Sequence, residues 1–312
     1  ISKTFIGIAL LQAEREGLLS LDDPVNKHLP FRVIHPRYPN QPILLRHLTQ
    51  HTAGINDDKN YDYAYSLLEP MTVSKDEISK GEYREMLEAS QNKAYDLGAY
   101  LQRFFTPGGR FYHKKNFTKR APGERYQYSN VGAALAAFAL ETASGQSFAE
   151  WTRERIFQPL GMNNTAWHPD EVDQKITHYF GNRKPMPNYL LATYPDGGVW
   201  TSVHQLGQYC TATIAGMQTG NDVLPREDYV RLLQNHVNTP KAGETYGNFW
   251  ERISSDLYGH SGGDPGIVTL MYISEENGYG HVVFTSGTPS GENFYNKALI
   301  PLIRYGRKLA AL

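Results

Sequence analysis

The sequence of 312 residues contains a single cysteine, Cys210, which excludes a disulfide within the chain and leaves the redox compartment undefined. Cys210 lies in a segment with helical periodicity and has no neighbouring base, so we expect a buried thiol rather than a nucleophile. No window approaches the ~20 consecutive apolar residues that a helix needs to cross a bilayer. No signal-peptide pattern is present, but the chain opens at Ile1 without an initiator methionine, so that absence excludes nothing.

An excess of charge of one sign is also missing. The 31 basic and 32 acidic side chains give a formal net charge of -1, which argues against nucleic acid as a partner. The local basic run from His113 to Arg120 is short and favours a solvated loop. With 40% hydrophobic residues, the chain can bury a sizeable core as one large domain or as two interleaved lobes.

Apolar residues recur at helical spacing over most of the chain, whereas the C-terminal quarter contains β-branched runs. Strands are predicted at 266–273 and 280–286, joined by a hairpin turn at 275–278. The expected helices cover residues 4–16, 44–52, 131–145, 148–157, 202–216 and 293–312. This order predicts an α/β chain of the α+β type, with an antiparallel sheet flanked by helices and a mostly helical lobe.

Residues 56–120 differ from their surroundings because they are polar and rich in Tyr, Asp and Lys. Aromatic residues remain frequent there, which argues against disorder. We interpret this segment as a helical insertion with long loops that shapes a neighbouring cleft.

The first segment with catalytic character is Lys3, at the start of the apolar helix. A buried lysine needs partners, and burial lowers its pKa toward that of a usable base. A nucleophile served by Lys3 must lie three or four positions away on the same helix face, which disfavours Ser2 and favours the position immediately before Ile1. A serine there would complete a Ser-x-x-Lys pattern at a helix N-terminus, where the dipole assists oxyanion chemistry. The alternative is a lysine at a frayed helix end.

The second segment is Tyr128-Ser129-Asn130, which precedes the 131–145 helix. Its alternation allows Tyr128 and Asn130 to face one cleft while Ser129 points away. A phenol can shuttle a proton near neutral pH only if a cation lowers its pKa, and Lys3 or a histidine could supply that charge. Asn130 can hydrogen-bond both a lysine and a substrate amide. A capped loop before the helix is the alternative reading.

The third segment is Gly259-His260-Ser261-Gly262-Gly263. Its small residues let a strand edge approach a ligand, and its backbone N–H groups could bind an oxyanion; a glycine-rich turn is the alternative. The segment also matches the Gly-x-Ser-x-Gly nucleophile elbow of α/β-hydrolases, with Ser261 as nucleophile. That motif needs a helix after the serine, whereas Asp264-Pro265-Gly266 and a strand follow here.

Two further patterns are set aside on context. Ser90-Gln-Asn-Lys93 has Ser-x-x-Lys spacing but lies in a polar stretch that would not desolvate its lysine. His47 and His51 have i, i+4 spacing without the Glu of a His-Glu-x-x-His zinc motif, so capping or core roles are expected.

The three segments and their order resemble the serine hydrolases related to class C β-lactamases, penicillin-binding DD-peptidases and their esterase relatives. The resemblance extends over nearly the whole chain. It includes family-like stretches at 17–30, 46–55, 159–162 and 197–202.

The resemblance implies an acyl-enzyme mechanism. A serine before Ile1 attacks a carbonyl, Lys3 and Tyr128 share the proton transfers, and the N–H groups of that serine and Gly263 bind the oxyanion. Asn130, Ser261, Gly262 and Gly263 contact the substrate. His260 occupies the place of a lysine in many β-lactamases and could hold a substrate carboxylate only when protonated. This departure shifts the expected substrate from β-lactams toward an ester, an amide or a D-amino-acid peptide.

The resemblance further implies a single β-lactamase-like catalytic domain over residues 1–312, lacking the strands that precede the nucleophile in the family, with the 56–120 insertion inside it. No cofactor or metal is implied, and the expected partner is a small-molecule or peptide acyl substrate. The resemblance suggests a periplasmic or secreted location. Two alternatives stay open: a catalytically inactive protein of the same fold, and an α/β-hydrolase that uses Ser261.

Overall fold

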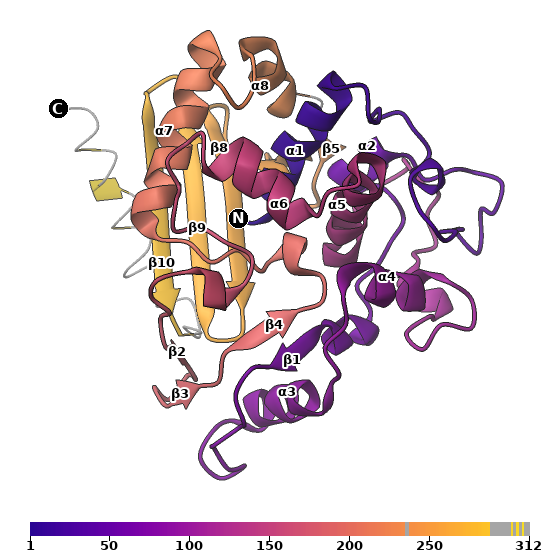
Figure 1. Ribbon diagram of the computed structural model, residues 1–312, viewed down its shortest axis with the longest axis vertical. Coiled ribbons are helices and arrows are strands. Elements are labelled where there is room, and N and C mark those ends of the chain that lie inside the picture. Colours follow the sequence, from indigo (N-terminus) through magenta and orange to yellow (C-terminus); the bar gives the residue numbers. More distant parts are fainter. Residues whose placement is uncertain (235–236, 288–300, 302–303, 306–307, 309–312) are drawn as a thin grey trace.

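The computed structural model describes residues 1–234, 237–287, 301, 304, 305 and 308. Two parts lie side by side: an antiparallel sheet crossed by α7 (Val203–Thr219), and a group of helices around α1 (Lys3–Arg15) and α5 (Asn130–Ser144) (Figure 1). One continuous hydrophobic core joins these parts, because Phe5 of α1 belongs to the same cluster as Trp250 in the sheet.

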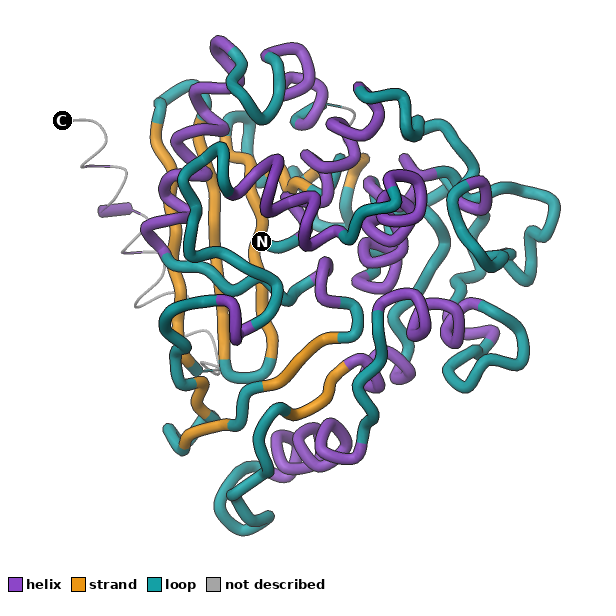
Figure 2. The backbone as a smooth tube through the Cα atoms, viewed as in Figure 1, coloured by secondary structure: helices purple, strands orange, loops and turns teal. Residues whose placement is uncertain are grey.

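In the described part of the chain, the main sheet has six strands in the order β10-β9-β8-β7-β6-β5, each antiparallel to its neighbour (Figure 2). Three strands are long and pair along their whole length, namely β8 (Leu257–Asp264), β9 (Ile267–Ser274) and β10 (Tyr279–Ser286). The other three are short: β5 (Val237–Asn238), β6 (Thr245–Gly247) and β7 (Trp250–Arg252).

Helix α7 covers one face of this sheet and contacts β10 and β9 (Figure 1). The approach is close because Gly280 of β10 has no side chain: a Cβ there would lie 3.0 Å from Cβ of Cys210. Cys210 is buried at this contact, and burial raises the pKa of its thiol to about 12. The expectation of a buried cysteine is therefore confirmed.

The helical part is built on α1, whose residues from Lys3 to Ala13 are all buried, and on the small-residue helix α5. Small side chains let these two helices pack against each other. Around them lie α2 (Leu45–Thr49), α6 (Phe148–Thr152), α8 (Arg226–Leu232), the 3₁₀ turns η1 (Val25–Lys27), η5 (Pro169–Glu171) and η6 (Tyr194–Asp196), and the π-helical turn η4 (Arg153–Phe157).

The segment 56–120 leaves and rejoins the helical part at one point. Asn56 N donates to Asn116 O at 2.9 Å, and Thr118 N donates to Gly54 O at 2.8 Å. Between these ends lie η2 (Lys59–Ala64), β1 (Tyr65–Leu67), α3 (Lys80–Gln91), α4 (Leu97–Phe105) and η3 (Lys114–Asn116). Strand β1 pairs with β4 (Tyr189–Leu191), and a further small ribbon joins β2 (His178–Tyr179) to β3 (Pro185–Met186).

The structure confirms the predicted fold class and most of the predicted elements. The predicted helix at 148–157 is present, and it changes from α-helical geometry in α6 to π-helical geometry in η4. The three short strands and α8 were not predicted, because two or three residues carry no readable periodicity. The expected closing helix at 293–312 lies almost entirely outside the described residues.

Candidate active site

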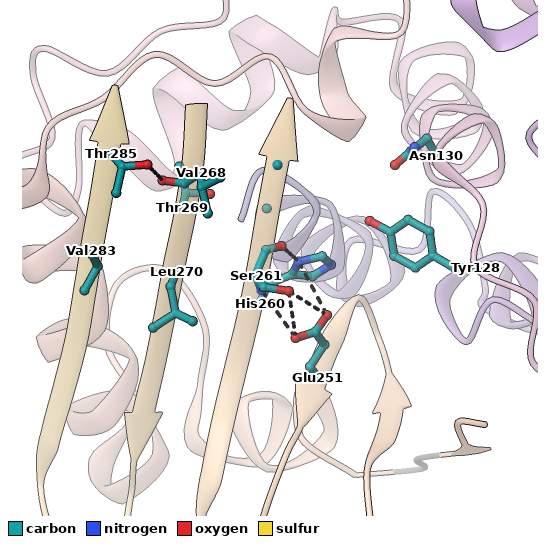
Figure 3. A pocket seen from close by; sticks show the side chains of 12 residues that line it. Tyr128, Asn130, Glu251, His260, Ser261, Val268, Thr269, Leu270, Val283 and Thr285 are labelled. Carbon is teal, nitrogen blue, oxygen red and sulfur yellow. Dashed lines mark hydrogen bonds and ion pairs between the residues drawn. The ribbon is translucent and has the colours of Figure 1, made fainter. Parts of the chain in front are cut away.

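A cleft of about 600 Å³ lies between the N-terminal ends of α1 and α5 and the strand β8. A second cavity of about 370 Å³ adjoins it along β8 (Figure 3). Tyr128, Asn130 and the stretch from His260 to Gly263 line both cavities, and Lys3 lines the first. The structure thus brings every site residue expected from the sequence to one place.

Lys3 is buried at the floor of the cleft and has two hydrogen-bond acceptors. Its Nζ donates to Asn130 Oδ1 at 2.6 Å and to the Asp196 carbonyl at 2.7 Å. The ammonium also lies 5.0 Å from the centre of the Tyr128 ring, within cation–π distance. Burial lowers the pKa of Lys3, although nearby carboxylates, Asp196 first among them, act in the opposite direction. A depressed pKa makes the neutral amine accessible as a base.

Ser2 does not face Lys3. Its Oγ accepts a hydrogen bond from Val199 N at 3.3 Å, on the other side of the helix start. The first turn begins at Ile1, because Thr4 N donates to Ile1 O at 2.9 Å. A position directly before Ile1 is three residues from Lys3, which is helical spacing for two side chains on one face.

Tyr128 and Asn130 are positioned by the N-terminal end of α5. Ser129 caps the helix by accepting from Gly132 N at 2.9 Å, and it donates its own hydroxyl to Asp57 Oδ1 at 2.7 Å. Asp57 also accepts from the backbone N–H groups of Asn130, at 2.5 Å, and Val131, at 3.2 Å. Ser129 is thereby turned away from the cleft, and Asn130 keeps its amide toward Lys3.

The protonation of Tyr128 differs from the expectation. Burial, together with nearby carboxylates, raises the pKa of the Tyr128 phenol well above its ordinary value. Lys3 lies over the ring and directs its hydrogen bonds to Asn130 and Asp196. This direction favours a neutral phenol, which can donate a proton, over a phenolate base.

His260 is buried behind the strand edge and is saturated with partners. Its Nδ1 donates to the Ser261 carbonyl, and its Nε2 accepts from the Tyr246 hydroxyl at 3.0 Å. Burial lowers the pKa of His260 well below its ordinary value. This direction favours the neutral imidazole over the protonated form that could hold a substrate carboxylate.

Ser261 lies in the middle of β8, where its side chain points to Glu251 rather than to a histidine (Figure 3). Glu251 accepts from Ser261 N at 3.3 Å and also bonds the Tyr272 hydroxyl. A nucleophile elbow needs a strand-to-helix turn after its serine, whereas β8 continues to Asp264 and turns into β9. The α/β-hydrolase alternative is therefore wrong, and so is a plain glycine turn.

The glycines of β8 fit a close approach of the chain start. A Cβ on Gly262 would lie 2.5 Å from Thr269 Oγ1 and 3.6 Å from the backbone nitrogen of Ile1, so α1 begins directly beside this strand. Gly263 has no atom within 4 Å of its Cβ position and leaves its side of the strand open to the cleft. Backbone groups here are accessible to a substrate carbonyl.

Several polar residues of the site were missed by sequence reasoning. Asp57 and Asp196 lie beside Lys3, Asp264 ends β8, and Glu251 accepts from Ser261 N in the middle of that strand. Burial raises the pKa of all four carboxyl groups, that of Asp196 to about 7. The sequence offers one signal for two of these carboxylates. Asp196 precedes Gly197, and Asp264 follows Gly263, so each adjoins a glycine stretch of the candidate site.

The two patterns set aside from the sequence lie elsewhere. Ser90 is exposed at the end of α3 and donates to Leu87 O, while Lys93 follows the helix. His47 Nδ1 accepts from Leu44 N at the start of α2, and His51 is buried. Within the described residues no group of three or more His, Cys, Asp or Glu side chains could hold a metal ion.

Comparison with known structures defines the class to which this architecture belongs. The structure of an octameric penicillin-binding protein homologue from Pyrococcus abyssi superposes with a TM-score of 0.71 at 23% identity, covering 96% of this chain and 64% of that one. D-amino acid amidase from Ochrobactrum anthropi SV3, in its complex with D-phenylalanine, superposes with a TM-score of 0.65 at 19% identity, covering 97% and 90%. The fold is that of the β-lactamase and transpeptidase group, in agreement with the prediction.

The sequence gives the family. The Beta-lactamase family model matches residues 1–304, and the chain belongs to this family. A penicillin-binding protein of Bacillus subtilis (strain 168) is 27% identical over 294 residues, which cover 87% of this chain and 56% of that protein. A β-lactamase-like protein of Arthroderma benhamiae is 23% identical, over 97% and 51%. The chain thus spans about half the length of the curated relatives it matches.

None of the helices in the described ranges combines the length and the apolar character that a transmembrane span requires.

Proposed function

We propose that this chain forms the acyl-transfer site of a serine hydrolase that acts on esters, amides or D-amino-acid peptides. The observation that carries the proposal is the environment of Lys3, a buried amine held between Asn130 and the Asp196 carbonyl at the edge of a glycine-rich strand. A lysine in such a place has no packing role to justify its burial, and its lowered pKa suits a general base.

The nucleophile in this proposal is a serine immediately before Ile1 in the full-length polypeptide. Two features support this position. The helical turn starts at Ile1, so the preceding residue shares the face of Lys3, and the Ile1 nitrogen lies beside Gly262. A serine hydroxyl at this point would lie at a helix N-terminus, close to both its base and the N–H groups of β8.

The proposed reaction proceeds through an acyl-enzyme. Neutral Lys3 accepts the proton of the serine hydroxyl as the oxygen attacks the substrate carbonyl, and the tetrahedral oxyanion is held by the N–H groups of the serine and Gly263. Tyr128, a neutral phenol, donates a proton to the leaving group and is reprotonated from the Lys3 ammonium. Water then attacks the acyl carbonyl, and the serine hydroxyl is restored.

The state of His260 bears on the choice of substrate. A neutral imidazole already bonded to Tyr246 supplies no positive charge for a substrate carboxylate. This favours esters, amides or peptides over β-lactams that carry a carboxylate. In the proposal His260 therefore positions Ser261 and the strand edge, while Asn130 and the backbone from Ser261 to Gly263 bind the substrate.

Labelling of the full-length polypeptide with a fluorophosphonate probe, followed by peptide mass spectrometry, tests the proposal. We expect one adduct, on the residue before Ile1, and at least a hundredfold slower labelling in Lys3→Ala, the range associated with loss of a general base. Ser2→Ala is the matched control and should label at the wild-type rate. An adduct on Ser2 or Ser261, or a residue other than serine before Ile1, would refute the assignment.

A further inference from the structure

The cleft is short of positive charge. Among the described residues that line it, the ionisable side chains other than tyrosines are Lys3, Asp196, Asp264, His178 and His260. Lys3 is engaged by Asn130 and Asp196, and burial lowers the pKa of both histidines. The described lining of the cleft therefore offers two carboxylates, Asp196 and Asp264, and no free cation that could bind a substrate anion.

Asp264 marks one end of this cleft. It is the last residue of β8, four positions after His260, and it is half-buried. Its Oδ1 accepts from the Tyr65 hydroxyl at 2.5 Å. Its Oδ2 lies over Gly197, where a Cβ would be only 3.1 Å away. Within the described residues, no lysine, arginine or histidine forms an ion pair with it.

Four rings that line the cleft form a continuous series that starts at Tyr65, the partner of Asp264, and that we term the aromatic wall: Tyr65, Tyr189, His178 and Trp200. Successive ring centroids lie 5.6 Å, 5.9 Å and 5.7 Å apart. Tyr189 ties the wall to the end of β8, because its hydroxyl donates to Pro265 O at 3.1 Å. Tyrosine and tryptophan faces attract cations.

His178 gives an independent indication of a ligand. It is only 5% exposed, it lines the cleft, and its Nδ1 is buried without a hydrogen-bond partner among the described residues. It adjoins the Asp264 turn, since a Cβ on Gly266 would lie 2.9 Å from His178 Cβ. A buried imidazole nitrogen without a partner is unfavourable unless a ligand satisfies it.

We propose that the cleft takes substrates that bear a primary ammonium group. The ammonium donates hydrogen bonds to Asp264 and His178 beside the aromatic wall. A primary ammonium has three N–H donors and one positive charge, which matches an unpaired carboxylate oxygen, a neutral imidazole and cation-attracting rings. The inference rests on the proposed hydrolase function and names its substrate class. The ammonium can belong to the acyl group or to the leaving group.

Paired substrates test the inference on the full-length protein. On the acyl side, the p-nitroanilides of D- and L-alanine are compared with their N-acetyl derivatives. On the leaving-group side, 4-(aminomethyl)phenyl acetate is compared with its N-acetyl derivative. We expect kcat/KM to favour the amine in one pair by about tenfold or more, as for hydrogen bonds to a charged group. The pair that shows the preference locates the ammonium.

The variant Asp264→Asn keeps the shape and the Tyr65 hydrogen bond but removes the charge, and it should reduce that preference at least about tenfold. Asp256→Asn, which removes a carboxylate outside the cleft in the turn before β8, should leave the preference unchanged. Tyr65→Phe, which keeps the Asp264 charge and the ring, should retain most of it. Equal turnover of amine and N-acetyl substrates, or an unchanged preference in Asp264→Asn, overturns the inference.

Titration calorimetry with D- and L-phenylalanine amide separates this inference from the proposed function. Lys3-dependent turnover of p-nitrophenyl acetate without any preference for amines, and without Asp264-dependent binding, refutes the ammonium site and leaves the hydrolase standing. Binding that Asp264→Asn abolishes, in a protein without Lys3-dependent turnover, refutes the hydrolase and leaves the ammonium site standing. Absence of both refutes both.

Discussion

Asp57 holds the start of α5 beside Lys3 by accepting three hydrogen bonds on one carboxylate. It accepts from the Ser129 hydroxyl and from the N–H groups of Asn130 and Val131, so it holds the first turn of α5 on the face that carries Asn130. Asn130 in turn receives Lys3. A residue at the edge of the 56–120 segment therefore fixes the orientation of the groups at the centre of the cleft.

We predict that Asp57→Asn destabilises the protein by about 1–3 kcal/mol, because an amide offers only one oxygen to three donors and presents N–H groups to N–H groups. Turnover should fall through kcat more than through KM, since Asn130 loses its fixed orientation. Urea unfolding and steady-state kinetics measure the two effects.

Asp96→Asn is the matched control for this prediction. Asp96 caps α4 by accepting one hydrogen bond from Ala99 N, and asparagine caps a helix equally well, so a change of a few tenths of a kcal/mol is expected. A similar small change in Asp57→Asn, with unaltered kcat, would show that Asp57 does not hold the site.

The convergence of the candidate site residues could be predicted from the sequence, because it follows from their spacing and their order along the chain. Lys3, Tyr128, Asn130 and the β8 glycines meet as their order suggested. Their protonation was not predictable. Tyr128 has a raised pKa because it is buried and, secondarily, because Glu251 and other carboxylates lie nearby, and no local sequence pattern reports burial by distant segments.

Helix α1 lies so close to the loop before β7 that only glycine fits at one point of its surface. A Cβ on Gly7 would lie 2.2 Å from the carbonyl oxygen of Asn248. Asn248 and Phe249 have positive φ, 49° and 63°, in a turn that bonds α2 through Phe249 N and Thr49 O at 3.0 Å. The position of α1, and with it Lys3, is therefore set by backbone contact.

We predict that Gly7→Ala destabilises the protein by about 1–3 kcal/mol, because the added methyl must push α1 and the Asn248 turn apart. The same shift moves Lys3 relative to Asn130, so activity should fall more than the loss of folded protein explains. Thermal unfolding together with activity per folded molecule measures both effects.

Gly81→Ala provides the comparison within a helix. Gly81 lies in α3 with nothing within 4 Å of its Cβ position, so alanine should stabilise by up to about 1 kcal/mol. If Gly7→Ala were equally stabilising, the close approach of α1 to Asn248 would be refuted.

At the scale of elements, the predictable parts were those with sustained periodicity. Helices α1 and α5 are apolar all round because they lie inside the core, and the hairpin β9–β10 carries β-branched residues and glycine turns. Strands β5, β6 and β7 depend on pairing with their neighbours, β7 with β8, β6 with β7 and β5 with β6, rather than on their own sequences. A strand defined by its partner is not visible in a local pattern.

The whole molecule buries several carboxylates around one lysine. Asp57, Asp196, Asp264 and Glu251 all have raised pKa values, caused first by burial. A carboxyl group whose pKa is higher in the folded than in the unfolded state binds more protons when folded, so its contribution to stability falls as pH rises. For Asp196 this window runs from 3.8, its ordinary value, to about 7.

We therefore predict that the free energy of unfolding of the wild type, minus that of Asp196→Asn, decreases by up to about 4 kcal/mol between pH 4 and pH 7. Asparagine keeps the hydrogen bond from the Tyr61 hydroxyl, 3.0 Å in length, and removes the titration. Urea unfolding at four or five pH values across this range measures the difference.

Asp256→Asn should show the opposite sign. Burial raises the pKa of Asp256, but hydrogen bonds from Ser274, Ser254 and Asn277 outweigh it and lower the pKa, so stability is lost as pH falls. A difference between wild type and Asp196→Asn that stayed constant with pH would show that Asp196 titrates normally.

The junction of the 56–120 segment has a consequence for how this molecule can change over evolutionary time. Its two ends are fastened to each other by the Asn56–Asn116 and Thr118–Gly54 hydrogen bonds, so whatever lies between closes upon itself. Lys3, Asn130 and β8 belong to the frame outside it, whereas Tyr61 and Tyr65 belong to the inside. The part of the segment beyond Asp57 can therefore be lengthened or exchanged at a small entropic cost: this alters one wall of the cleft, while Asp57 and the residues of the frame are inherited unchanged.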